Sequence, residues 1–334
     1  MSRVNVSIVG ATGAVGSEVL RILEERRFPV GRLRVIASGR SEGTDIPFQG
    51  RSHKVENLAK VDFAGTDLVL SAPGASVSRE FAPKAVAAGA VVVDKSSAFR
   101  MLPEVPLVVP EVNADALAGH KGIIACPNCS TILLAVVLGP IHRAFGLRRV
   151  VVSTYQAVSG AGRKGMEELN RQTVALLTQR PLERSHFPHP IAFNLIPQID
   201  TFRSDGYTGE EVKLIEETRK ILGLPDLAIT CTAVRVPVMN GHSESVNLAC
   251  ERPVTPEACR EVLAAARGVS VQDDPAGKEY PMPMAASGRD EVFVGRIRKD
   301  PSQDNGVDLW LSGDNLRKGA ALNSIQIAEV LFAN

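Results

Sequence analysis

The start of the chain decides its fold, because an apolar run, Val4–Val9, leads directly into Gly10-Ala11-Thr12-Gly13-Ala14-Val15-Gly16. An amphipathic segment, Ser17–Arg26, follows at once. Glycines between a strand and a helix allow a sharp turn, and they let backbone N–H groups approach a pyrophosphate at the helix start. The spacing differs from the standard G-x-G-x-x-G, so the position of the motif carries the prediction of a dinucleotide site. A tight turn without a ligand is the alternative.

The rest of the first 150 residues repeats this alternation of apolar runs and amphipathic stretches. Unbroken Val, Ile and Leu runs are typical of strands buried on both faces, and their order predicts βαβ units. We therefore predict an α/β fold that begins with a Rossmann-type, doubly wound parallel sheet. The expected strands are Val4–Val9, Leu33–Ala37, Asp67–Ser71, Ala90–Asp94, Pro106–Val109 and Gly122–Ala125, and the expected helices are Ser17–Arg26, Ser78–Ala88 and Asn113–Gly119.

The second half has longer strand candidates that come late and close together, which predicts an α+β domain on a largely antiparallel or mixed sheet. A final segment with helical spacing, Asn315–Phe332, is expected to return to the first domain. We thus expect the first domain at residues 1–128 plus 315–334 and the second at 129–314. The strand candidates are Val150–Ala157, Ile229–Val236, Ser245–Cys250, Glu291–Arg298 and Val307–Ser312, and the helix candidates are Lys164–Leu177, Glu210–Leu222 and Pro256–Ala266.

Length and composition exclude several classes of protein. The 334 residues suit two domains, and 44% hydrophobic with 22% charged residues is typical of a globular protein. A net charge of +1 argues against a nucleic-acid partner, and no N-terminal run is long enough to span a membrane. The five cysteines, an odd number in a long chain, favour reduced thiols. We expect a cytoplasmic protein with neither nucleic-acid nor membrane partners.

The segment after the second expected strand indicates which dinucleotide is bound. An NAD site usually carries Asp or Glu there to accept the ribose hydroxyls. This chain instead has Ala37-Ser38-Gly39-Arg40-Ser41. Because a guanidinium group offers a planar fork to phosphate oxygens, Arg40 with the hydroxyls of Ser38 and Ser41 favours the 2′-phosphate of NADP. Arg40 as a solvated loop cation is the alternative.

A cysteine pair, Cys126 and Cys129, lies between the last strand of the first domain and an apolar helix candidate. If Asn128 caps that helix, Cys129 lies in its first turn, where the helix dipole favours a thiolate nucleophile. A zinc site would need a second ligand pair, which the remaining cysteines do not provide, so we expect no metal. The C-x-x-C spacing alone also allows a thioredoxin-like dithiol, but the glycine turn and the long second domain do not fit that fold. A buried thiol with a purely structural role is the simplest interpretation, and we prefer it for Cys126, Cys231, Cys250 and Cys259, whereas we expect Cys129 to be the nucleophile.

One histidine, His242, has a better context than the other five because it follows a turn signal, Asn240-Gly241. If those two residues formed a hairpin loop, Arg235 would share a face with His242, roughly 13 Å away along the strands. Pro237 favours a bend that would shorten this gap. A cysteine nucleophile, a histidine acid/base and an arginine for a substrate carboxylate form a sensible acyl-transfer site.

Ten motifs, in order and almost from end to end, resemble the aspartate-β-semialdehyde dehydrogenase family. They are GATGAVG, ASGRSEG, SAPGASVSREFAPKAV, DKSSAFR, VPLVVPEVN, PNCST, TYQAVSGAG, the EEVK segment, RVPVMNGHSESV and DNLRKGAALNSIQIAE. Individually some of these motifs are modest, but ten in the same order are highly specific.

The resemblance implies roles for residues at matching positions. Cys129 matches the nucleophile, His242 the acid/base and Gln156 the residue that orients the thioester. Arg235 matches the fork for the substrate α-carboxylate, and Glu210 a carboxylate near its amino group. Arg100 and Lys213 match the basic groups that receive the phosphate, and Asn128 is a further expected substrate contact. The expected cofactor contacts are Gly10, Thr12, Gly13, Ala14, Val15, Gly16, Ser38, Arg40, Ser41, Ser71, Ala72, Ser159, Gly160 and Asn315.

Without the resemblance, Glu210 and Lys213 would be interpreted as a solvated ion pair near a helix start, where Thr208 and Glu211 can form a capping box. Two departures from the family pattern stand out. Lys95, directly after Asp94, stands where the family more often has asparagine. Cys126 likewise replaces an asparagine that is common in the family. Because Cys126 lies three positions before Cys129, we hypothesise a reversible disulfide between them.

The resemblance implies NADPH-dependent reduction of L-aspartyl-β-phosphate to the semialdehyde, with phosphate release through a cysteine thioacyl intermediate. It also implies a homodimer, or a tetramer, with the second domain's sheet at the contact. The competing hypotheses are N-acetyl-γ-glutamyl-phosphate reductase, which shares the cysteine chemistry, a catalytically silent binding relative, and a dithiol redox protein.

Overall fold

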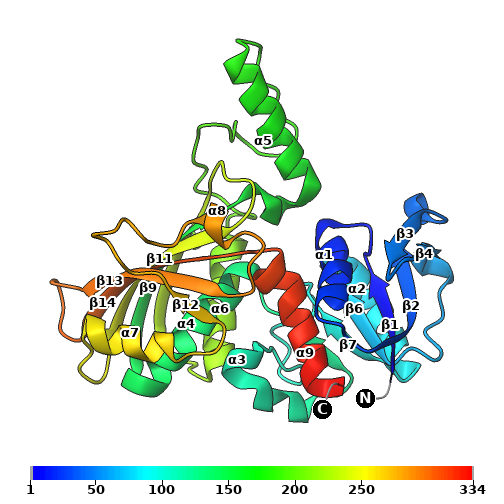
Figure 1. Cartoon of the computed structure of the whole chain (residues 1–334), viewed down its shortest axis with the longest axis horizontal. Helices are drawn as coiled ribbons and strands as arrows, with labels where there is room; N and C mark the ends of the chain where they lie inside the picture. Colours follow the sequence, from blue (N-terminus) through cyan, green and yellow to red (C-terminus); the bar gives the residue numbers. More distant parts are fainter. Residues whose placement is uncertain (1–2, 333–334) are drawn as a thin grey trace. The chain divides into compact units, whose positions relative to one another are not determined.

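The computed structural model describes residues 3–332 and divides the chain into two compact units (Figure 1). The first unit comprises the chain up to Asn128 together with the C-terminal segment from Ala320. The second unit is the continuous stretch Cys129–Gly319. The boundary therefore falls directly before the expected nucleophile.

A parallel sheet forms the centre of the first unit, in the strand order β5-β2-β1-β6-β7-β8. After β2 on one side of β1, the chain returns to β6 on the other side, so the strand order reverses at β1, where doubly wound folds bind ligands. The Rossmann-type prediction is confirmed. The strands are β1 (Val4–Val9), β2 (Val30–Ala37), β5 (Glu56–Asn57), β6 (Leu68–Ser71), β7 (Val91–Asp94) and β8 (Ile123–Ala125).

Helices pack on this sheet through apolar faces that recur at helical spacing. Helix α1 (Ala14–Glu25) buries Val19, Ile22 and Leu23, and α2 (Ala75–Ala87) follows β6. The C-terminal helix α9 (Asn323–Phe332) contributes Ile325 to the same apolar core. The end of the chain thus belongs to the fold of its beginning.

The second unit is built on a mixed sheet with the order β10-β9-β11-β14-β13-β12. The pairs β9–β10 and β12–β13 are parallel and the others antiparallel, which confirms the mixed-sheet prediction. The strands are β9 (Leu147–Gln156), β10 (Ala228–Arg235), β11 (His242–Cys250), β12 (Val269–Val271), β13 (Val292–Lys299) and β14 (Gly306–Gly313).

Helices α4 (Cys129–Phe145), α6 (Gly209–Leu222) and α7 (Pro256–Ala264) pack against this sheet. Figure 1 shows α5 (Gly162–Leu177) projecting away from it, and α8 (Pro283–Ala286) is a single turn. The expected capping box of α6 is present, with Thr208 and Glu211 bonding reciprocally. No helix within residues 3–332 is both long and apolar enough to cross a bilayer.

Some expected elements of the first unit are wrong in detail. Pro106–Val109 is not a strand, because only Leu107 bridges to β8. The expected helix Asn113–Gly119 is split into α3 (Pro110–Asn113) and a 3₁₀ segment, Ala114–Gly119. The side chain of Asn113 explains both, since it bonds the N–H of Val109 and the carbonyl of Leu107 and holds a turn there.

The C-terminal helix and several short elements also differ from expectation. The segment expected as one helix from Asn315 begins with a π-helical stretch, Arg317–Leu322, before α9. A hairpin of β3 (Asp45–Phe48) and β4 (Arg51–Lys54) lacks a strong apolar pattern and was not predicted. Further short 3₁₀ segments are Gly39–Ser41, Leu58–Lys60 and Val158–Ala161.

Candidate active site

The glycine turn after β1 uses its glycines for different reasons. Gly10 has φ +85°, a conformation that L side chains rarely adopt, and its carbonyl accepts a hydrogen bond from the Gly13 N–H at 3.0 Å. A Cβ on Gly16 would lie 2.3 Å from the Gly10 carbonyl oxygen, so only glycine lets α1 start this close to the strand. Gly16 therefore serves packing, and Gly10 and Gly13 shape the turn.

A cavity of about 630 Å³ lies beside this turn, at the carboxyl ends of β1, β2 and β6. Its walls include an aromatic pair, Phe63 and Phe81, whose ring centres are 5.8 Å apart. Size and lining fit a nucleotide. Of the expected cofactor residues, Gly10, Thr12, Gly13, Ser38 and Ala72 line it. The sequence reasoning missed Phe63 and Phe81, because isolated phenylalanines in a connecting segment and a helix carry no ligand signal.

The other expected cofactor residues of the first unit lie outside this lining. Ser71 is buried and donates to the Asp94 carboxylate at 2.6 Å, which gives its hydroxyl a structural role. Ala14 and Val15 begin α1. Arg40 is exposed, directly after the cavity residue Gly39, and has no hydrogen-bond or ion-pair partner within residues 3–332. Ser41 ends the same 3₁₀ segment. Arg40 is therefore available to a 2′-phosphate.

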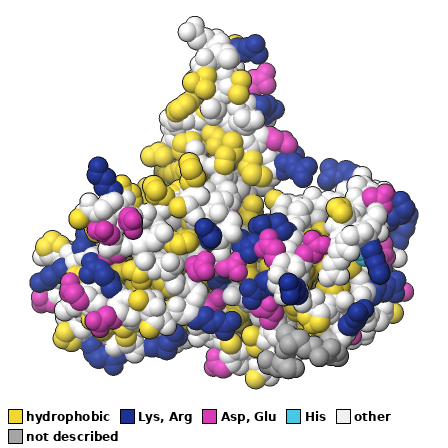
Figure 2. All heavy atoms as spheres, viewed as in Figure 1, with side chains coloured by type: hydrophobic (Ala, Val, Ile, Leu, Met, Phe, Trp, Pro, Cys, Tyr) yellow, Lys and Arg dark blue, Asp and Glu magenta, His cyan; other side chains and the backbone are white. Residues whose placement is uncertain are grey.

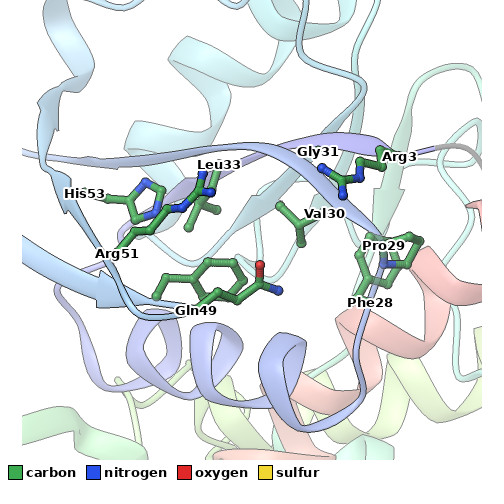
Figure 3. A pocket seen from close by; sticks show the side chains of 10 residues that line it. Arg3, Phe28, Pro29, Val30, Gly31, Leu33, Gln49, Arg51 and His53 are labelled. Carbon is green, nitrogen blue, oxygen red and sulfur yellow. The ribbon is translucent and has the colours of Figure 1, made fainter.

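Another hollow, of about 460 Å³, lies at the opposite, amino ends of β1 and β2 (Figure 3). Arg3, Arg51 and His53 approach it around an apolar floor that includes Leu33 and Phe48. None of the expected site residues lines this hollow. Open α/β sheets bind their ligands at the carboxyl ends of the strands, so the nucleotide belongs in the first cavity.

The expected nucleophile begins the second unit. Cys129 is the first residue of the 17-residue helix α4 and is partly exposed, whereas the other four cysteines are buried, and none of the five forms a disulfide. The positive end of a helix dipole favours a thiolate in this position. Gly319 passes close by, since a Cβ there would lie 3.0 Å from that of Cys129.

Three further expected residues lie level with one another on neighbouring strands, and we call them the catalytic row. Arg235 on β10 pairs with Gln156 on β9, and the pairing of Ser243 with Tyr155 brings His242 on β11 level with Gln156. All three side chains are buried. The hairpin considered at Asn240-Gly241 does not form, because β9 lies between β10 and β11. The strand order thereby shortens the gap that a hairpin would have left.

The backbone of Ala157 connects the two ends of the row. Its N–H donates to Nδ1 of His242 at 3.0 Å, and its carbonyl accepts from the Arg235 guanidinium at 2.7 Å. Because Nδ1 accepts, a neutral His242 ring carries its proton on Nε2. Gly160 leaves room beside that atom, since a Cβ there would lie 3.2 Å from Nε2 and 3.0 Å from the Arg235 guanidinium.

Gln156, at the centre of the row, is held at both ends of its amide. Thr154 donates to Oε1 at 3.0 Å, and Nε2 donates to the Glu210 carboxylate at 3.2 Å. Because Glu210 accepts only, it fixes the amide orientation and leaves one N–H of Nε2 for a substrate oxygen. Thr154 was not among the expected site residues, although its position two residues before Gln156 on the same strand face was a usable signal.

Charges from several elements surround Arg235. Burial lowers the pKa of its guanidinium, while the charges of Glu210 and Cys129 raise it, so both groups lie close enough to interact. Beside Arg235 is a cavity of about 210 Å³, whose lining also includes His186, Gln198 and Asp200. This cavity fits a small amino-acid derivative, and the sequence reasoning did not single out Gln198 or Asp200.

The Lys213 side chain does not extend freely into solvent but contacts two carboxylates. Its Nζ lies 2.6 Å from an Asp200 oxygen and 3.4 Å from a Glu210 oxygen. Glu210 is buried, which excludes the interpretation of a fully solvated pair. The two expected substrate residues of the EEVK segment therefore do lie together with Gln156 in the second unit.

Ser159 and Asn315, expected near the nicotinamide, hold two loops together. The hydroxyl of Ser159 donates to Asn240 and lies within hydrogen-bond distance of Asn315, which also accepts from the Gly241 N–H at 2.9 Å. Their side chains thus fix the Gly160 loop against the turn that precedes His242.

The remaining expected residues lie in the first unit. Arg100 is buried and donates to the carbonyls of Cys126 at 3.0 Å and Lys95 at 2.6 Å. Asn128 is the last residue before α4. The Cys126 thiol is buried against α9, where Asn323 donates to its sulfur at 3.3 Å. A disulfide with Cys129 therefore requires Cys126 to leave this position, and it stays a hypothesis.

Together, a Rossmann-type unit and a thiol at a helix start with an ordered histidine, glutamine and arginine define a dinucleotide-dependent oxidoreductase of the cysteine acyl-transfer class. Two family models match the chain: semialdehyde dehydrogenase, NAD binding domain, over residues 5–120, and semialdehyde dehydrogenase, dimerisation domain, over residues 138–318. The chain belongs to the semialdehyde dehydrogenase family.

Relatives and solved structures agree along the whole chain. It is 53% identical to the aspartate-semialdehyde dehydrogenase of Aquifex aeolicus, covering 98% of this chain and 97% of that one, and 50% identical to that of Bacillus subtilis with the same coverage. The structure of aspartate semialdehyde dehydrogenase II from Vibrio cholerae, complexed with ASA, matches with a TM-score of 0.97 at 44% identity, covering 100% and 99% of the two chains. The Candida albicans enzyme with NADP matches at 0.79 and 26% identity, covering 99% and 98%.

Proposed function

We propose that this protein reduces L-aspartyl-β-phosphate to L-aspartate-β-semialdehyde with NADPH and releases phosphate. The observation that carries the proposal is the catalytic row beside a helix-start cysteine, in a chain whose relatives are aspartate-semialdehyde dehydrogenases. N-acetyl-γ-glutamyl-phosphate reductase is not favoured, and the presence of every acyl-transfer residue argues against a silent relative.

The first chemical step uses residues of the second unit. The Cys129 thiolate attacks the acyl carbon, the carbon–oxygen bond to phosphate breaks, and phosphate leaves with the electron pair as a thioester forms. The free N–H of Gln156 and the backbone N–H groups at the start of α4 stabilise the oxyanion. Arg235 holds the α-carboxylate, Glu210 the ammonium group and Lys213 the phosphate, for which the family resemblance also implies Arg100 of the first unit.

The second step needs a hydride, which NADPH supplies when it is bound at the glycine turn. The cavity beside Gly10 and Gly13 would hold the nucleotide, with Arg40 and the hydroxyls near it on the 2′-phosphate. Once the hydride has reached the thioester carbon, His242 donates a hydrogen bond from Nε2–H to the resulting oxyanion, which collapses to the aldehyde as the carbon–sulfur bond breaks and Cys129 leaves as the thiolate. Gly160 supplies the space in which this oxygen lies.

The test is phosphate-dependent NADP reduction by the purified protein with aspartate semialdehyde, repeated with Cys129→Ser. We expect activity in the parent and a loss of at least about 10³-fold in the variant, because the hydroxyl is a far weaker nucleophile. N-acetylglutamate semialdehyde serves as the competing substrate. Parent activity with that substrate alone, or a variant as active as the parent, would contradict the proposal.

We further propose a homodimer, with a tetramer as the alternative, formed through the second unit. The unit matches a dimerisation domain. Its sheet bears partly exposed Tyr155 and Trp310, whose rings are 5.1 Å apart. Exposed apolar side chains also gather on and beside the projecting helix α5, among them Leu177 and Phe193 (Figure 2). Such surfaces mark protein contacts. We place the protein in the cytoplasm, since its relatives are biosynthetic enzymes and its mechanism needs a reduced thiol.

A further inference from the structure

Asp200 is a carboxylate in the wall of the cavity beside Arg235, and its backbone has φ +71°. Aspartate is one of the few residues other than glycine that tolerates this conformation. Two contacts determine where the side chain lies, and a third holds the backbone carbonyl of Asp200. The Thr201 N–H donates to Oδ1 at 2.8 Å, the Gln198 amide donates to the Asp200 carbonyl at 3.3 Å, and Lys213 donates to Oδ2 at 2.6 Å.

The helix that carries Lys213 is shaped to admit this carboxylate. Gly209 is the first residue of α6, and a Cβ there would lie 2.8 Å from Oδ2 of Asp200. Any other residue at position 209 would thus displace the carboxylate from Lys213. The glycine, the left-handed backbone at Asp200 and the short contact to Lys213 point to one built arrangement.

The charges around Lys213 favour its cation. Burial opposes the charge, yet Glu210 and Asp200 together raise the pKa of the Lys213 ammonium group. The hydrogen bond from Lys213 in turn lowers the pKa of Asp200. Lys213 is therefore charged and already paired with two carboxylates. In the proposed function, the same lysine has to bind an anionic phosphate.

We propose that Asp200 is a specificity-determining residue that competes with phosphate for Lys213. This inference rests on the proposed function, in which Lys213 receives the substrate phosphate. A phosphate group must displace the Asp200 carboxylate before it can pair with Lys213. An acyl phosphate anchored by Arg235 at its other end gains enough contacts to do so, whereas free inorganic phosphate competes poorly and leaves readily after the acyl transfer.

The experiment compares the parent with Asp200→Asn, because asparagine also tolerates a positive φ but carries no charge. Asp205→Asn is the matched control, since Asp205 follows Asp200 closely and pairs with Arg203 at 3.6 Å. The Michaelis constant for inorganic phosphate is measured with saturating aspartate semialdehyde and NADP. Calorimetry measures inorganic phosphate binding to the protein without nucleotide, and thermal unfolding checks that each variant folds.

We expect Asp200→Asn to lower the Michaelis constant and the dissociation constant for inorganic phosphate by about threefold, since Lys213 and Asp200 are partly exposed and such pairs are weak. Asp205→Asn should have the same phosphate constants as the parent. When Lys213→Met is present, adding Asp200→Asn should no longer change these constants. Unchanged phosphate constants in Asp200→Asn overturn the inference. So does a raised Michaelis constant for aspartate semialdehyde alone, which would place Asp200 on the substrate ammonium group. A parent without phosphate-dependent activity refutes the proposed function instead.

Discussion

The glycine turn of the first unit and the catalytic row of the second are the two proposed ligand sites, and they are built in opposite ways. The turn is a run of consecutive residues from Gly10 to Gly16, and it works through backbone N–H groups. The row takes Arg235, Gln156 and His242 from three strands that are distant in the sequence, and it works through side chains.

This difference determines what each site can tolerate. A backbone site is sensitive to an added Cβ, because the carbonyl of Gly10 lies where the Cβ of residue 16 would be. A side-chain site is sensitive to the hydrogen bonds that orient its groups, such as the one from Thr154 to Gln156. Substitutions that affect one kind of site should therefore leave the other kind intact.

Apart from replacement of the nucleophile, the largest effect is expected for Gly16→Ala in the turn. The new methyl group would lie against backbone atoms that cannot give way, which should cost about 1–3 kcal/mol of unfolding free energy. It should also weaken NADPH binding. Denaturant unfolding and quenching of NADPH fluorescence measure the two effects.

Gly74→Ala is the control for this substitution, because Gly74 directly precedes α2 of the same unit and a Cβ there meets nothing within 4 Å. Equal stability losses in both variants would remove close packing as the reason for glycine at position 16.

A smaller effect is expected for Thr154→Val in the second unit. Valine has the same shape but cannot donate to Oε1 of Gln156, so the amide loses its anchor and the oxyanion its oriented donor. We expect kcat to fall roughly fivefold, the equivalent of about one hydrogen bond, with a smaller change in KM. Steady-state kinetics measure this.

Thr154→Ser keeps the hydroxyl and should restore most of kcat. NADPH affinity should be unchanged in both variants, because the turn lies in the other unit. If valine and serine at position 154 reduce kcat equally, the hydrogen bond to Gln156 is not what matters.

A different kind of effect, on the pH dependence of stability, concerns Glu244, two residues after His242 on the same strand. Its side chain is fully buried, neither oxygen has a hydrogen-bond partner within residues 3–332, and burial raises its pKa well above the ordinary 4.5. As pH rises above 4.5, the unfolded chain loses a proton that the folded protein keeps, so the stability contributed by this residue falls with pH.

Glu244→Gln removes this proton linkage. The melting temperature of the variant relative to the parent should therefore increase steadily between about pH 5 and pH 8. Glu216→Gln, at an exposed position of α6, is the control and should show no trend. A constant difference across this range would mean that Glu244 is already ionised in the folded protein.

Prediction from the sequence worked where local chemistry decides the outcome. The strand, turn and helix from Val4 to Glu25, the start of α4 at Cys129 and the capping box of α6 all follow from neighbouring residues. It could not decide the strand pairing around Asn240-Gly241, because a turn signal does not reveal which strand the next one pairs with. It missed Asp200, whose role depends on a lysine that another element carries.

The order of motifs along the chain was enough to indicate the fold class, the glycine turn and the nucleophile, since each depends on contacts between residues close in sequence. Only the tertiary structure decided that β9 separates β10 from β11, that Thr154 and Glu210 orient Gln156, and that Asp200 forms an ion pair with Lys213. The physical reason is that strand order and side-chain pairing arise from burying a whole sheet at once, and no single stretch of residues encodes them.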